Sequence, residues 1–142
     1  MTQRGLARRF EDELRRVGLP ARIVGASGEA SSFGDGEVLA HLDTLLLRLV
    51  RDRGQEFLDL ARVSRPSHFH RFDDVEVALG WRSLADMLAR TEPEPLHLVL
   101  ERVRSKLPEL RDAFEGDRAP LTEKRIEEAA RKRADALLAR AP

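Results

Sequence analysis

Two histidines, His68 and His70, are separated by one residue and form the closest pair of imidazoles in this sequence. On an extended segment, side chains two residues apart point to the same side, so both rings could bind one metal ion. The nearest carboxylates, Asp73 and Asp74, are better placed to begin a helix, which leaves no evident third ligand. We therefore expect no metal and no cofactor, and we keep a metal-dependent hydrolase built on the two histidines as an alternative.

Side chains suited to nucleophilic catalysis are also scarce. The chain contains no cysteine, which excludes thiol catalysis and disulfides. Ser27, Ser31 and Ser32 fall in a glycine-rich stretch, Gly25–Gly36, without a Gly-x-Ser-x-Gly pattern or a nearby histidine. The same stretch lacks the spacing of a phosphate-binding loop and the lysine that follows such a loop. The sequence therefore predicts a protein that is not an enzyme.

The overall charge balance argues against a polyanionic partner. The 142 residues include 25 basic and 25 acidic side chains, so the formal net charge is zero. A neutral chain has no global field that would concentrate nucleic acid or anionic lipid. The run Arg131-Lys132-Arg133 could contact phosphate or could simply be exposed to solvent. A nucleic-acid-associated regulator therefore stays open as a less favoured alternative.

One segment, from Asp73 to Pro120, has an acidic excess, with 11 acidic and 7 basic side chains. Such a segment suits either a solvated surface or a surface that attracts a basic partner. Trp81 could be the aromatic anchor of that surface, or it could pack in the core after Gly80. The residues that we expect to contact a partner are Trp81, Asp86, Glu92, Glu94, Glu101 and Glu109.

A β-hairpin is the clearest of the elements that must position these side chains. Leu45–Arg51 can fold back on Glu56–Arg62 through the loop Asp52–Gln55, whose glycine supplies a positive φ. In the register that makes Arg48 face Asp59, one face of the hairpin is apolar and the other carries this ion pair. The apolar face consists of Leu47, Leu49, Leu58 and Leu60.

The segment before the hairpin predicts a helix and further strands. Apolar residues recur at helical spacing at Leu6, Phe10, Leu14 and Val17. The pattern ends at Gly18-Leu19-Pro20, after which Ala21–Val24 and Glu37–His41 are expected to be strands. We expect the glycine-rich stretch between them to be a loop. The hairpin would complete a meander of three to four antiparallel strands.

The chain changes to helical periodicity after Arg71. Asp73 is expected to be an N-cap, with Glu76 as its capping-box partner, and Gly80 should end that short helix. Ser83 should cap the next short helix.

The longest apolar pattern in the chain follows, and we call it the seam. Its members are Leu96, Leu100, Val103, Leu107, Leu110 and Phe114. Pro108 should break the helix near Lys106–Leu107, because proline lacks an amide hydrogen and clashes with the preceding turn. Pairing of two seams would make a homo-oligomer, so a self-associating structural or regulatory subunit is an alternative.

The last expected helix, Glu123–Arg140, would be capped by Thr122. Its apolar stripe consists of Ile126, Ala130, Leu137 and Leu138. No stretch is apolar enough to span a membrane, and the charged N-terminus does not resemble a signal peptide, so we expect a cytoplasmic protein.

These patterns together predict an α+β fold in a single domain, residues 1–142. Residues 1–80 would form an N-terminal helix on the antiparallel meander and a short helix. Residues 81–142 would form a helical half.

Three segments carry a resemblance to a known group of proteins. They are Val50–Gln55, the strand Phe57–Leu60 and the helix start Phe72–Val75, within a match from about Phe33 to Leu79. This pattern resembles small bacterial proteins of the immunity type, from polymorphic or contact-dependent toxin systems. The resemblance implies a non-catalytic protein that binds a cognate protein toxin and occludes its active site, and it assigns no particular residue to that role.

Overall fold

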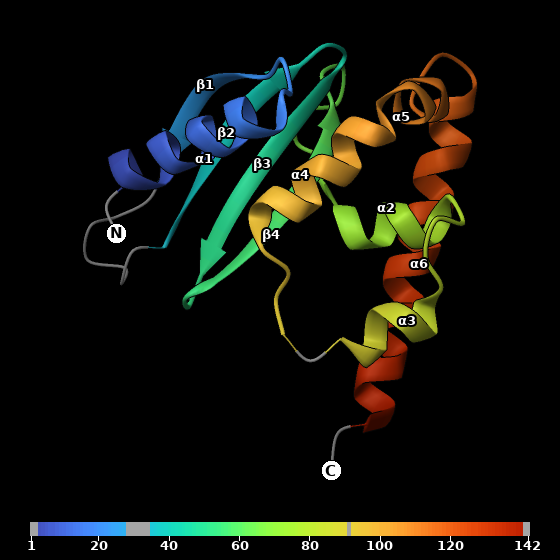
Figure 1. Ribbon diagram of the computed structural model, residues 1–142. Coiled ribbons are helices and arrows are strands. Elements are labelled where there is room, and N and C mark those ends of the chain that lie inside the picture. Colours follow the sequence, from blue (N-terminus) through green and yellow to red (C-terminus); the bar gives the residue numbers. More distant parts are fainter. Residues whose placement is uncertain (1–2, 28–34, 91, 141–142) are drawn as a thin grey trace.

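The chain folds around an antiparallel sheet of five strands in the order β1-β2-β3-β4-β5 (Figure 1). The structure, a computed structural model, describes residues 3–27, 35–90 and 92–140. An N-terminal helix precedes the sheet and a helical half follows it, which confirms the α+β prediction. The elements are α1 (Gln3–Val17), β1 (Arg22–Ser27), β2 (Gly36–Leu42), β3 (Leu45–Asp52), β4 (Gln55–Arg62), β5 (His70–Arg71), α2 (Phe72–Ala78), α3 (Leu84–Ala89), α4 (Leu96–Ser105), α5 (Leu107–Ala113) and α6 (Arg118–Arg140).

The β3–β4 hairpin has the predicted register. Arg48 pairs with Asp59 across the two strands, and their side chains form a hydrogen-bonded ion pair at 2.8 Å. The loop is shorter than expected, because Asp52 and Gln55 already pair. Only Arg53 and Gly54 turn the chain, with φ values of 52° and 79°. Two consecutive positive φ values are typical of a type I′ turn, which matches the twist of the strands.

One face of the sheet forms the core together with helices α1 and α4, which lie side by side across it (Figure 1). The hairpin leucines point into this core, as do the predicted apolar residues of α1. The buried side chains include Leu6, Phe10, Leu14, Val17, Leu47, Leu49, Leu58 and Leu60.

The seam also belongs to this core, which corrects one prediction. Its residues Leu96, Leu100, Val103, Leu107, Leu110 and Phe114 are all buried within the chain. They pack against the chain's own sheet and α1, so they do not form a surface for a second copy. Helix α4 ends at Ser105 and α5 begins at Leu107, which confirms the break expected from Pro108.

Both ends of the glycine-rich stretch Gly25–Gly36, which was predicted to be a loop, belong to strands. Gly25–Ser27 belong to β1, which carries a bulge between Ile23 and Gly25, and Gly36 begins β2. The centre of the expected loop, 28–34, lies outside the described residues.

Two predicted helix caps are wrong, and each has a physical reason. Helix α2 begins at Phe72, with Arg71 as an N-cap residue that makes no side-chain bond, because β5 runs directly into the helix. Asp73 therefore lies within the first turn rather than before it. Helix α6 begins at Arg118, and the Thr122 hydroxyl donates to the carbonyl of Ala113 at 2.6 Å.

Other helix ends agree with the sequence. The Ser83 hydroxyl accepts the amide of Asp86 at 3.0 Å at the start of α3, and Gly80 follows α2 with a φ of 76°. Helix α6 packs on α2 and α3, but its expected stripe is buried only in part. Leu137 and Leu138 are 49% and 73% exposed. Among the described residues, no helix combines the length and the apolarity needed to cross a bilayer.

The core predicts a clear contrast between two leucines. Leu60→Ala should lower the free energy of unfolding by about 2–5 kcal/mol, because Leu60 is fully buried and its truncation leaves a cavity. Leu138→Ala, the exposed control, should change it by less than about 0.5 kcal/mol. Urea unfolding measures both, and equal effects would contradict this placement of the core.

Candidate functional site

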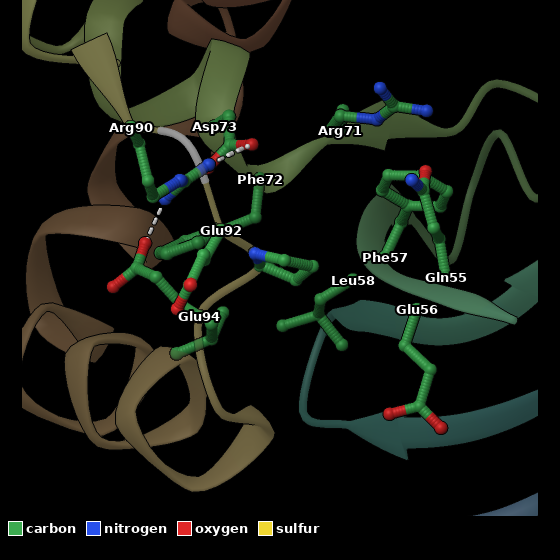
Figure 2. Close-up of a pocket in the computed structure, with 12 residues that line it drawn as sticks. Gln55, Glu56, Phe57, Leu58, Arg71, Phe72, Asp73, Arg90, Glu92 and Glu94 are labelled. Atoms are coloured by element: carbon green, nitrogen blue, oxygen red, sulfur yellow. Dashed lines mark hydrogen bonds and ion pairs between the residues drawn. The ribbon is translucent and has the colours of Figure 1, made fainter. Parts of the chain in front are cut away.

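A cavity of about 240 Å³ lies between the edge of β4 and the segment that joins α3 to α4 (Figure 2). We call it the edge slot. Its apolar lining is Phe57, Leu58, Phe72, Pro93 and Val99, and its polar lining is Gln55, Glu56, Arg71, Asp73, Arg90, Glu92 and Glu94. It contains two of the acidic residues predicted to contact a partner.

The slot exists because the sheet edge is incomplete there. Every residue of β4 pairs with β3, but only Asp59 and Leu60 pair with the two-residue strand β5. The chain leaves the sheet at Phe72 and enters α2. Within the described residues, no strand therefore covers the outer edge of β4 over Gln55–Leu58.

Three arginines fix the opposite wall of the slot by binding Glu94. Arg102 donates to both carboxylate oxygens, at 2.6 and 2.9 Å, Arg82 donates at 3.2 Å, and Arg90 also binds the carboxylate. Burial alone would raise the pKa of Glu94, but the hydrogen bonds and charges of Arg102 and Arg82 outweigh it and lower that pKa. Glu94 is therefore ionised at neutral pH and is tied to the loop between α2 and α3, to the end of α3 and to α4.

The same arginines connect the wall to α2. Arg90 bonds Asp73 at 2.9 Å, and Arg102 bonds Glu76 at 2.8 and 3.1 Å. We call Arg82, Arg90, Arg102, Asp73, Glu76 and Glu94 the arginine network. It uses the two carboxylates that were predicted to form the capping box, which is a second reason why the predicted cap is wrong.

Two charges at the slot have no ion pair within the described residues. Arg71 lies with its guanidinium carbon 4.2 Å from the centre of the Phe57 ring, and Glu92 is exposed. By contrast, Glu56 is bound by Arg9 and lies 3.6 Å from Arg51. The slot thus presents one guanidinium and one carboxylate to a ligand.

The acidic residues that were predicted to contact a partner divide into two groups. Asp86, Glu92, Glu101 and Glu109 are exposed on the helical half and form no ion pair in the described structure. Glu94 belongs to the arginine network and is not a free surface charge.

Trp81 is half-buried against the core, with the Lys106 ammonium 5.2 Å from the centre of its ring. This position agrees with the core-packing alternative for the tryptophan.

The predicted metal-binding pair, His68 and His70, lies in two different environments. His70 is buried, and its Nε2 lies 3.1 Å from Glu123 of α6. Glu123 also binds Arg62 and Arg65. Burial would raise the pKa of Glu123, but its bonds to His70 and Arg62 outweigh that effect and lower it. His68 is exposed, and no metal-binding group of three His, Cys, Asp or Glu side chains occurs in the part of the chain described.

The basic run Arg131-Lys132-Arg133 on α6 is divided between an internal ion pair and the solvent-exposed surface. Arg133 bonds the buried carboxylate of Asp74 at 2.8 and 3.0 Å and so joins α6 to α2. Arg131 and Lys132 are exposed. The three bases therefore do not form one phosphate-binding surface.

Comparisons of this chain with protein-family models, with curated proteins and with solved structures found no match.

The arginine network predicts a pH-dependent effect of Glu94→Gln. At neutral pH this change should lower the free energy of unfolding by about 1–3 kcal/mol, because it weakens charged hydrogen bonds to three arginines. The pKa of Glu94 is lower in the folded state than its ordinary value of 4.5. Its contribution is therefore present above that value and is lost as the pH falls through the folded pKa.

Urea unfolding at pH 7 and near pH 3 tests this effect. The difference between wild type and Glu94→Gln should shrink at the acidic pH. Glu109→Gln, at an exposed carboxylate that pairs with no described residue, is the matched control and should have little effect at either pH. An equal loss of stability at both pH values would contradict the ionic role of Glu94.

Proposed function

We propose that this chain is a non-catalytic protein-binding protein, most concretely an immunity protein that neutralises a cognate bacterial toxin by occluding its active site. One observation carries the proposal: in the acidic segment Asp73–Pro120, Arg82, Arg90, Arg102 and Arg111 are held in ion pairs, whereas seven exposed carboxylates form none within the described structure.

In the described part of this segment, seven acidic side chains form no ion pair, against three basic ones, Arg104, Lys106 and Arg118. Arg82, Arg90 and Arg102 are held in the arginine network, and Arg111 pairs with Asp43 at 2.5 Å. Exposed carboxylates that form no ion pair within the described residues lie along α3, α4 and α5 and in the connecting segments. They are Asp86, Glu92, Glu101, Glu109, Asp112, Glu115 and Asp117.

An acidic surface on a rigid scaffold suits a partner with a basic cleft. Toxins that act on nucleic acids need such a cleft, because their substrates are polyanions. Opposite charges accelerate the encounter of the two proteins and orient them before contact. A protein docked over the cleft would then exclude the substrate. The resemblance to immunity-type proteins also supports a role in binding and blocking a toxin.

Charge reversal on the helical half tests the proposal. Glu101→Lys combined with Glu109→Lys should reduce the association rate constant with the toxin about tenfold at low salt, and less at high salt. Asp12→Lys, at an exposed acid of α1 without an ion pair in the part of the chain that the structure describes, is the control and should leave the rate almost unchanged. Glu94 is unsuitable for this test because its loss would disturb the arginine network.

The test uses the product of the gene adjacent to this one, to which the proposal assigns the role of the toxin. Stopped-flow fluorescence measures the association rate, and growth of cells that express both proteins measures neutralisation. Failure of the wild-type chain to bind that product or to restore growth would overturn the proposed function. Binding without any effect of the double charge reversal would overturn the role of the acidic surface.

A further inference from the structure

We propose that the edge slot binds an extended segment of the partner protein, which adds to the sheet as a strand beside β4 and in line with β5. This inference rests on the proposed protein-binding function and specifies one contact through which it would operate.

The hairpin register determines which backbone groups point into the slot. Asp52 and Gln55 close a two-residue turn and are therefore a hydrogen-bonded pair. Such pairs alternate along antiparallel strands, so Phe57 also bonds to β3, whereas Glu56 and Leu58 direct their amides away from it. Leu60, two residues further in the same phase, is the position that pairs with β5.

The outward amides identify the chemistry of the occupant. Donors and acceptors spaced along a strand edge are matched by the backbone of another extended polypeptide, the mode of recognition known as strand addition. A small ligand would match one of these groups at most. The position continues β5, beyond which no described strand pairs with β4, because the chain turns into α2 after Arg71.

The walls of the slot are already in place for such a segment. The arginine network fixes Glu94, and Figure 2 shows Glu92 and Glu94 on the segment that faces the edge of β4. Phe57 and Leu58 supply apolar surface on the strand side, and Pro93 and Val99 supply it on the other side. A preformed slot reduces the entropy lost on binding.

The two slot charges without an ion pair predict the partner's side chains. Arg71 pairs with Asp59 across the sheet and lies over Phe57, which places it on the face of the sheet away from α4. Glu92 lies in the segment that leads into α4, on the opposite side. Successive side chains of a strand point to opposite faces, so the bound segment should carry an acidic residue facing Arg71 and a neighbouring basic residue facing Glu92.

The decisive experiment compares two substitutions at Glu56 in binding to the adjacent gene's product. Glu56→Thr and Glu56→Pro both remove the carboxylate that binds Arg9, but only proline also removes the outward amide. The threonine variant should bind within about threefold of wild type, since it keeps the backbone donor. The proline variant should bind at least about tenfold more weakly than the threonine variant.

Circular dichroism of both variants verifies that they fold, and amide exchange of the wild-type complex gives a second measurement. The amides of Glu56 and Leu58 should exchange more slowly in the complex than in the free chain. Equal binding of the two variants, or unprotected amides in the complex, would overturn strand addition and leave the proposed function standing. A wild-type chain that forms no complex would overturn both.

Discussion

The carboxylate of Glu94 is the point on which the arrangement of the helical half depends. It receives hydrogen bonds from Arg82, Arg90 and Arg102, two of which also bind carboxylates of α2. Partly buried ion pairs often add little net stability, because removing charges from water is costly, but they discriminate strongly against other arrangements. Here the pairs specify where the segment between α3 and α4 lies. The same pairs occupy three of the arginines in the segment Asp73–Pro120, whose seven exposed acids form no ion pair among the described residues.

The open edge of β4 follows from a second constraint, the early departure of the chain from the sheet. Phe72 is fully in the core and begins α2, so β5 contains only two residues. Asp74 of α2 is then buried against Arg133 of α6, and His70 of β5 meets Glu123 of the same helix. Docking of α6 therefore holds α2 in place and keeps β5 short. The two constraints together form the slot. The early departure of the chain from the sheet leaves the edge of β4 uncovered, and the ion pairs of Glu94 position the wall opposite that edge.

Local patterns in the sequence could predict four strands of the sheet and most of the core, but neither the short fifth strand, β5, nor this site. The hairpin register follows from alternating leucines and charges, and the buried seam follows from its spacing, since both are properties of neighbouring residues. The cap predicted at Asp73 failed because distant arginines bind the carboxylates that a capping box would use. Choosing among many arginines and acids requires the tertiary fold, and only the four-residue spacing of Arg90 and Glu94 hints at their contact.

The acidic surface and the edge slot would act at different distances in the proposed complex. Charge attraction extends for roughly 10 Å at moderate ionic strength, so it governs how fast and in which orientation two proteins meet. Backbone hydrogen bonds to the strand edge require contact, so they govern how slowly the complex dissociates. Glu92 belongs to both features, because it is exposed in the acidic segment Asp73–Pro120 and also lines the slot. A basic side chain drawn towards the helical half would thus bring the segment that carries it to the edge of β4.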